Sequence, residues 1–159
     1  MGFPILALDP TTVNDASPTH TTGMVYQGLD KKLYRYGQFK DAVTYAAGQV
    51  CTIAAVDQTA FTNDISGGSS IGSIVAGICL AVMTQNYYGF VLCSGYYATI
   101  KTSGADDIAV GEALFVHSST DGTCDGASAS TFSTGNFGVA SVADIDADNT
   151  VAGIVRGLV

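Results

Sequence analysis

Hydrophobic residues in this chain fall into short segments in which apolar and polar positions tend to alternate, and which end at Gly, Asp or Asn. Alternation with a period of two is typical of β-strands, whereas an amphipathic helix repeats its apolar positions every three or four residues. Residues 23–29 and 33–39 are rich in Tyr, Val and Phe and flank a polar turn at 30–32, which predicts a β-hairpin. Over the whole chain we expect about ten short strands and no helix.

The segment 77–95 predicts a second hairpin, and its pairing bears on the fold class. A pairing centred on Asn86 would make both faces apolar, with Leu80, Val82, Phe90 and Leu92 on one face and Cys79, Ala81, Val91 and Cys93 on the other. Such a hairpin must be central in a barrel or sandwich, or be covered by another subunit. The next segment, 96–102, alternates and predicts a further strand.

Further segments complete the predicted order of strands. Residues 41–57 indicate a strand, a turn at Gly48 and another strand, and 107–123 repeats this pattern weakly around Gly111. A glycine in that place allows a tight turn or a bulge. The composition of 118–136 is that of a loop, and the residues after it supply two closing strands. The predicted fold class is all-β, a small β-barrel or sandwich.

Residues 1–22 differ from the rest and predict an extended N-terminal arm ahead of a β-domain at 23–159. They contain all three prolines and have neither a helical nor an alternating period. Proline fixes its own backbone angle and pushes the preceding residue towards an extended conformation. The apolar run at 3–8 could therefore lie as a strand on another surface. The alternative is a terminus that frays.

Composition narrows the function classes. The chain has 159 residues, enough for one domain, and carries 14 acidic against 6 basic residues, a net charge of −8. This balance argues against binding nucleic acid or an anionic membrane, since both need clustered Lys and Arg. No apolar run reaches the ~18–20 residues that span a bilayer, and the first residues lack the basic start of a signal peptide. We expect a soluble protein made in the cytoplasm of the producing cell.

The charges are unevenly distributed. Residues 1–101 carry six acids and five bases, a net charge of −1, and 102–159 carry eight acids and one base, a net charge of −7. Four of the six bases are close together, at Lys31, Lys32, Arg35 and Lys40. They form either a solvated hairpin or a basic patch that meets an acidic partner, such as the acidic half of a second copy.

Few residues offer catalytic chemistry. The two histidines are His20, in the arm, and His117, at the end of a predicted strand. His117 could join Asp121 and a serine, or assist a cysteine nucleophile, but the chain has no GxSxG motif. Glu112 is the single glutamate and follows a turn glycine. We predict no catalytic residues and no enzyme.

Metal and cofactor sites are not predicted either. The cysteines at 51, 79, 93 and 124 show no CxxC spacing, so buried thiols are the expectation, although pairing about Asn86 would allow a disulfide between Cys79 and Cys93. Asp144, Asp146 and Asp148 have the spacing of the first ligands in a calcium loop. The sixth and twelfth positions are Asn149 and Val155, instead of the Gly and Glu that such a loop needs.

Tyrosines occur in two adjacent pairs on predicted strands, Tyr87 with Tyr88 and Tyr96 with Tyr97, and Phe90 lies between them. Adjacent strand residues face opposite ways, so each pair should send one ring inwards and one outwards. Outward rings could stack on sugars or form a subunit interface, and simple packing is the alternative.

The order of four segments resembles the small decoration, or cement, proteins of tailed bacteriophage heads, particularly those of marine and cyanobacterial phages. These segments are GMVYQGLDKKLYRYGQFKDAVTYAAGQVC, GICLAVMTQNYYGFVLCSGYYATIKT, VGEALFVHSSTDG and AGIVRGLV, and the likeness covers 23–159. It depends on the order of glycine turns and apolar strands, and YYGFVLCSG is its most distinctive block.

The resemblance implies a compact β-barrel or β-tulip with an N-terminal arm. It further implies a trimer, or another oligomer, that is made in the host cytoplasm, sits on the outer surface of the expanded capsid and clamps neighbouring major capsid proteins together. The arm residues expected to touch the capsid are Phe3, Pro4, Ile5, Leu6 and Leu8. A structural virion protein is therefore the expected function, and a carbohydrate-binding module on the virion is the alternative.

Overall fold

The computed structural model describes residues 2–40, 44–54, 58–64, 74–104, 107–127, 132–144 and 149–157, with the backbone alone for 132–135. These residues form eleven strands and one 3-10 turn, η1 (Pro10–Thr12), and contain no α-helix, which confirms the all-β class. No helix that could cross a membrane occurs in this part of the chain. The strands are β1 (Ile5–Leu6), β2 (Val25–Gly28), β3 (Leu33–Phe39), β4 (Val50–Ile53), β5 (Ala60–Thr62), β6 (Val75–Cys79), β7 (Tyr88–Lys101), β8 (Ala113–His117), β9 (Cys124–Gly126), β10 (Phe132–Ala140) and β11 (Thr150–Arg156).

Five strands close into a barrel in the order β3, β5, β4, β6 and β7, because β7 pairs back with β3. The contact between β3 and β5 is parallel, and the other four are antiparallel. β2 extends the barrel outwards from β3, and β1 adds to β2. The predicted hairpin about 30–32 is confirmed as β2 and β3.

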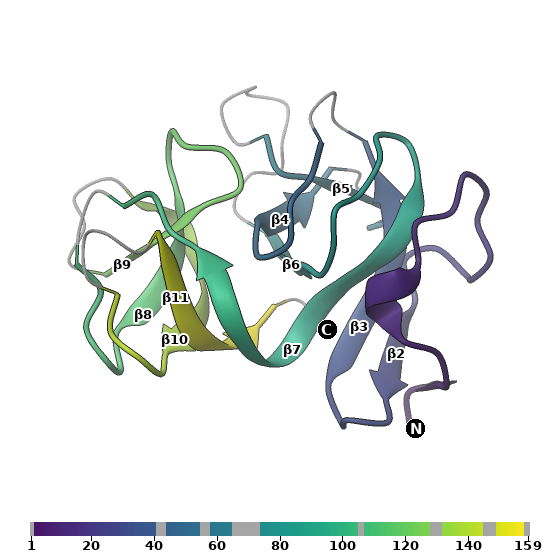
Figure 1. Cartoon of the computed structure of the whole chain (residues 1–159), viewed down its shortest axis with the longest axis horizontal. Coiled ribbons are helices and arrows are strands. Elements are labelled where there is room, and N and C mark those ends of the chain that lie inside the picture. The colour runs from purple at the N-terminus through teal and green to yellow at the C-terminus, as the bar shows by residue number, and fades with distance from the viewer. Residues whose placement is uncertain are drawn as a thin grey trace.

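β7 belongs to two sheets and links the two halves of the molecule (Figure 1). Its first half pairs with β3 and β6, and its second half pairs with β11. A second sheet continues from there in the order β7, β11, β10, β8 and β9. A single bridge between Thr102 and Cys124 connects β9 back to the end of β7. The two strands predicted on either side of Gly95 are therefore one, and Gly95 has a φ of 133° where the strand passes between sheets.

The β6–β7 pairing differs from the predicted register by two residues. Cys79 lies opposite Val91, whereas the predicted pairing placed it opposite Cys93. The intervening loop explains the difference, because it makes contacts of its own. Its Met83 forms a bridge with Tyr45, and the backbone N–H of Asn86 donates to the carbonyl of Phe39 at 2.6 Å.

The core has two parts, one on each side of β7. Val91 and Cys93 face the barrel interior, where they join Phe39 and Phe61 in one cluster. The other face contributes Phe90, Leu92 and neighbouring residues to a second cluster, which continues into the interior of the second sheet. Both faces of the first half of β7, at residues 89–93, are thus buried by the chain itself, as a central barrel strand requires.

Two segments differ from their predicted structure. The segment 118–136, expected to be a loop, contains β9 and the first residues of β10. Tyr45 was expected in a strand that pairs across Gly48, but it bridges to Met83 instead, and Val43 lies outside the described residues. Gly48 and Gly111 do form turns directly before β4 and β8, with φ values of 87° and 84°, so the predicted role of these glycines is confirmed.

Candidate binding surfaces

The arm, described from residue 2 to residue 22, packs along the barrel and exposes several of the residues expected to touch a capsid. β1 pairs in parallel with β2. Because successive strand residues face opposite ways, Leu6 is 3% exposed and Ile5 is 62% exposed. Phe3 and Leu8 are 43% and 39% exposed, and Pro4 is exposed as well. Four of these five residues therefore lie on the surface, and Leu6 anchors the arm.

Other contacts hold the arm in place beyond β1. Asp9 caps η1, since its Oδ1 accepts hydrogen bonds from the hydroxyl of Thr11 at 2.7 Å and from the backbone N–H of Thr11 at 2.9 Å, and these two bonds lower the pKa of Asp9. Val13 is buried in the larger core cluster. Asp15 bridges to Tyr88 through two backbone hydrogen bonds. The arm is thus part of the folded body along most of its length.

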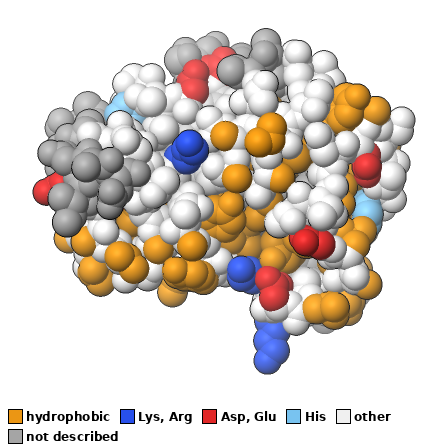
Figure 2. Space-filling model, viewed as in Figure 1, with side chains coloured by type: hydrophobic (Ala, Val, Ile, Leu, Met, Phe, Trp, Pro, Cys, Tyr) orange, Lys and Arg blue, Asp and Glu red, His pale blue; other side chains and the backbone are white. Residues whose placement is uncertain are grey.

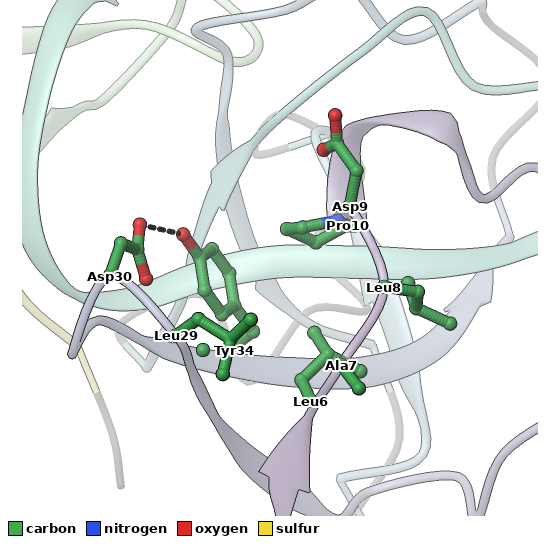
Figure 3. A pocket seen from close by; sticks show the side chains of 9 residues that line it. Leu6, Ala7, Leu8, Asp9, Pro10, Leu29, Asp30 and Tyr34 are labelled. Carbon is green, nitrogen blue, oxygen red and sulfur yellow. Dashed lines mark hydrogen bonds between the residues drawn. The ribbon is translucent and has the colours of Figure 1, made fainter.

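A hollow of about 290 Å³ lies between the arm and the turn that joins β2 to β3 (Figure 3). Its lining is mostly apolar and includes Leu6, Leu8, Pro10, Leu29 and Tyr34. At its edge the hydroxyl of Tyr34 donates to Asp30 at 2.7 Å. Burial and the neighbouring Asp30 carboxylate raise the pKa of Tyr34 well above its usual value. The tyrosine therefore stays protonated and fixes the turn.

The aromatic residues expected at a subunit interface are spread over the molecule. Phe90 is 1% exposed and belongs to the core, which corrects its assignment to a surface. Tyr88 and Tyr97 are half-buried and pack against the same core cluster. Tyr87 is half-buried beside the barrel, and Tyr96 is 49% exposed on the second sheet. A sugar-binding platform of neighbouring rings is not formed by these residues.

The four clustered bases of the sequence do not form one patch. Arg35 points into the barrel, is 4% exposed, and donates to the side-chain oxygen of Gln58 at 2.6 Å. Lys31 and Lys32 lie at the turn between β2 and β3, and Lys40 follows the far end of β3. Alternation along β3 explains why a residue close in sequence to the lysines is buried.

His117 is part of a buried polar network. Its Nε2 lies 3.3 Å from Oδ2 of Asp125, and the two side chains are 7% and 1% exposed. Ser103 donates to the other carboxylate oxygen of Asp125. The Nδ1 of His117 accepts hydrogen bonds from the backbone N–H groups of Ser119 and Thr120, at 3.1 and 2.7 Å. Both ring nitrogens therefore have polar neighbours, and the serine contacts the aspartate instead of the histidine, so this group lacks the order of a catalytic triad.

His20 packs against aromatic rings of the core. Its ring lies 5.1 Å from the ring of Tyr36 and 5.3 Å from that of Phe90, measured between centroids. Thr19 Oγ1 lies 3.1 Å from its Nδ1.

The aspartate beside His117 is Asp125, and not Asp121, which the sequence analysis had considered. The spacing of residues along the chain did not single out Asp125.

All four cysteines are buried free thiols, as expected from the sequence. Burial raises the pKa of Cys93 to about 11, although the nearby Arg35 acts in the opposite direction. Burial, with Asp125 and Asp144 close by, raises the pKa of Cys124 further. Protonated, buried thiols are poor nucleophiles, so Cys93 and Cys124 act as core side chains.

An acidic hollow that the sequence analysis missed lies beside the second sheet. It measures about 580 Å³ and is lined by residues 107–112 and 143–144. Three of these residues are acidic, namely Asp107, Glu112 and Asp144. Oδ2 of Asp144 accepts a hydrogen bond from Thr102 at 2.7 Å, whereas Asp146 and Asp148 lie outside the described residues. No group of three metal-ligating side chains occurs among the residues described.

The outer face of the second sheet carries an apolar row. Tyr96, Ile154, Val139 and Ala113 lie side by side in register across β7, β11, β10 and β8. Tyr96 and Ile154 are 49% and 45% exposed. Hydrophobic side chains gather on the lower left of Figure 2, where Figure 1 places β8, β10 and β11. This face and the exposed side chains of the arm are the main apolar surfaces found here.

No protein-family model matches the chain, and no curated protein sequence matches it. A solved structure, the crystal structure of the head fiber gp8.5 N base in bacteriophage phi29, is similar with a TM-score of 0.48 and 15% sequence identity. The similarity covers 79% of this chain and 96% of that chain. It is too weak to establish a common fold, so no property of the fibre is assigned to this chain.

Proposed function

We propose that this chain is a structural protein of a tailed-phage head, a decoration protein that sits on the outer surface of the capsid. In this role it self-associates, as a trimer or a similar oligomer, and stabilises the head by bridging major capsid proteins. The order of segments over 23–159 supports the proposal, and so does the all-β body. A protein with this function needs rigidity and binding surfaces, and it needs no catalytic group.

The observation that carries the proposal is the row of exposed apolar side chains on an anchored arm. Phe3, Ile5 and Leu8 face solvent while Leu6 holds the segment on the barrel. Burying one such side chain against a partner contributes roughly 1.5–3 kcal/mol. Because the arm is already ordered by β1 and η1, little of this free energy is lost to ordering on binding.

Repetition strengthens such a contact. Copies held together in an oligomer present several arms to one capsid, and the later contacts form at high effective concentration. Weak individual contacts can therefore give stable attachment to a lattice of identical sites.

The test uses point variants of the full chain, because deletion of the arm would also remove the core residues Leu6 and Val13. A triple variant, Phe3→Ser, Ile5→Lys and Leu8→Lys, is expected to lose co-sedimentation with expanded capsids assembled from the major capsid protein of the same genome. The matched control is Val82→Lys, which changes an equally exposed residue in the β6–β7 loop, at 63% exposure. Undiminished binding of the triple variant would move the contact to another surface.

A further inference from the structure

The turn between β2 and β3 forms a projecting tip, defined here as residues 29–32. Leu29 is 78% exposed, more than any other large hydrophobic residue among those described. Next to it Lys31 is exposed, with a φ of 66°. Lys or Arg side chains project at the bottom of Figure 2, where Figure 1 places this turn. The tip thus presents an apolar side chain beside a cation.

The tip is rigid before any partner arrives. The backbone N–H of Gly28 donates to the carbonyl of Lys32 at 2.9 Å, and that of Lys31 donates to the carbonyl of Gly28 at 3.0 Å. Asp30 accepts from the backbone N–H of Lys32 and from the hydroxyl of Tyr34. A loop that is already in its bound shape loses little conformational entropy on binding.

The acidic hollow beside the second sheet complements the tip, because it offers an apolar side chain and acidic groups. Val110, which is 65% exposed, forms part of its wall, and Asp107 is exposed at the same place. Asp144 also lines it, is 2% exposed, and has one carboxylate oxygen, Oδ1, with no hydrogen-bond partner among the described residues. The hollow is therefore partly apolar and acidic, and it contains one buried carboxylate oxygen without a hydrogen-bond partner among the described residues.

Charge complementarity identifies the occupant. The tip carries Lys31 and Lys32 against Asp30, which pairs with Lys32 at 3.6 Å, so its net charge is +1, whereas residues 102–159 carry eight acids against one base. The hollow, with a volume of about 580 Å³, has room for a leucine and a lysine side chain. A second copy of this chain supplies both groups on one preformed turn, at the same concentration as the hollow itself.

We propose that the tip of one copy inserts into the acidic hollow of the next copy, so that the copies assemble head to tail. Leu29 would pack against Val110, and Lys31 would face Asp107. A contact between two different surfaces is heterologous and closes into a ring when the rotation allows it. This inference names the contact behind the self-association in the proposed function, but it is tested in solution without any capsid.

The experiment measures mass by sedimentation velocity for two surface variants of the full chain. The tip variant is Leu29→Ser with Lys31→Ser, and the hollow variant is Val110→Lys with Asp107→Lys, so that the altered tip and the altered hollow do not attract each other. The wild type is expected to sediment as a multiple of 16.3 kDa, and each variant alone as a 16.3 kDa monomer. An equimolar mixture should give a dimer of 2 × 16.3 = 32.6 kDa and nothing larger, because each pair retains only one intact tip–hollow contact.

The control variant Val82→Lys, exposed elsewhere, should keep the wild-type mass. Circular dichroism must show that each variant is folded, and the single changes Lys31→Glu and Asp107→Lys provide milder versions that should each weaken association about tenfold. A wild type that remains monomeric would overturn the proposal. Variants that keep the wild-type mass would overturn it as well, as would a mixture that stays monomeric.

Discussion

At the scale of single residues, the polar groups that sequence reasoning considered for catalysis turn out to hold strands together. His117 on β8 contacts Asp125 on β9, and Ser103, which follows β7, donates a hydrogen bond to Asp125. From the sequence, Asp121 was the aspartate considered beside His117, because spacing along the chain does not reveal which residues a sheet brings opposite each other. The alternation of residues along β8 and β9 shows which side chains share a face, but the pairing of His117 with Asp125 could be predicted only if the register between the two strands were known.

The buried pair predicts a loss of stability on substitution. Asp125→Asn removes the carboxylate that accepts a hydrogen bond from Ser103 and lies 3.3 Å from Nε2 of His117, so we expect unfolding to become easier by about 2–3 kcal/mol. Asp121→Asn, a change of the same chemistry four residues away, should have an effect within about 0.5 kcal/mol. Chemical denaturation at pH 7 measures both, and equal effects would contradict the role given to Asp125.

The buried thiols predict a dependence of stability on alkaline pH. The pKa of Cys93 is raised to about 11 in the folded state, so its contribution is complete below its unfolded pKa of about 8.5 and is lost as the pH rises towards 11. Each such group contributes a slope of about 1.4 kcal/mol per pH unit in that range. Cys93→Ala should flatten the pH dependence of the unfolding free energy.

Val91→Ala is the matched control, since it makes a similar cavity in the same strand and cluster without removing a thiol. It should lower stability at every pH and leave the slope unchanged. Parallel curves for wild type and Cys93→Ala would show that this thiol does not titrate as described.

At the scale of elements, apolar alternation predicted most of the strands and two of the antiparallel pairings. It did not predict that one strand, β7, serves two sheets, because the pattern around Gly95 resembles a turn. It also missed β9, whose residues Cys124–Gly126 lie in a segment rich in Ser, Thr and Gly. Their burial results from tertiary packing, which local composition does not show.

Gly48 and Gly111 provide a test of how the two halves are joined. Both have left-handed φ values, of 87° and 84°. A Cβ atom on Gly48 would lie 2.1 Å from the backbone oxygen of Thr99 on β7, whereas one on Gly111 would meet no atom within 4 Å. We expect Gly111→Ala to cost about 1 kcal/mol from backbone strain alone.

Gly48→Ala should cost clearly more, about 3 kcal/mol, because the strand or the turn must also move. Thermal and denaturant unfolding of the two variants measure the difference. Similar losses in both would show that the approach of Gly48 to β7 is not restrictive.

At the scale of the whole molecule, the all-β barrel and the two-sided apolar strand could be predicted from sequence, but the binding surfaces could not. The four lysine and arginine residues near 31–40 suggested one patch, and the structure buries Arg35 and separates Lys40 from the others. The acidic hollow forms where 107–112 meets 143–144, a contact between segments distant in sequence. Surfaces of this kind depend on topology, which a hydrophobic pattern does not specify.

The most direct test of the proposed function is cryo-electron microscopy of expanded heads, assembled from the major capsid protein of the same genome, with and without this protein added. We predict extra density on the outer surface, in which the barrel and its arm are recognisable and each copy contacts more than one capsid protein. The triple arm variant at residues 3, 5 and 8 should leave the heads bare. Heads that remain bare with saturating wild-type protein would contradict the account.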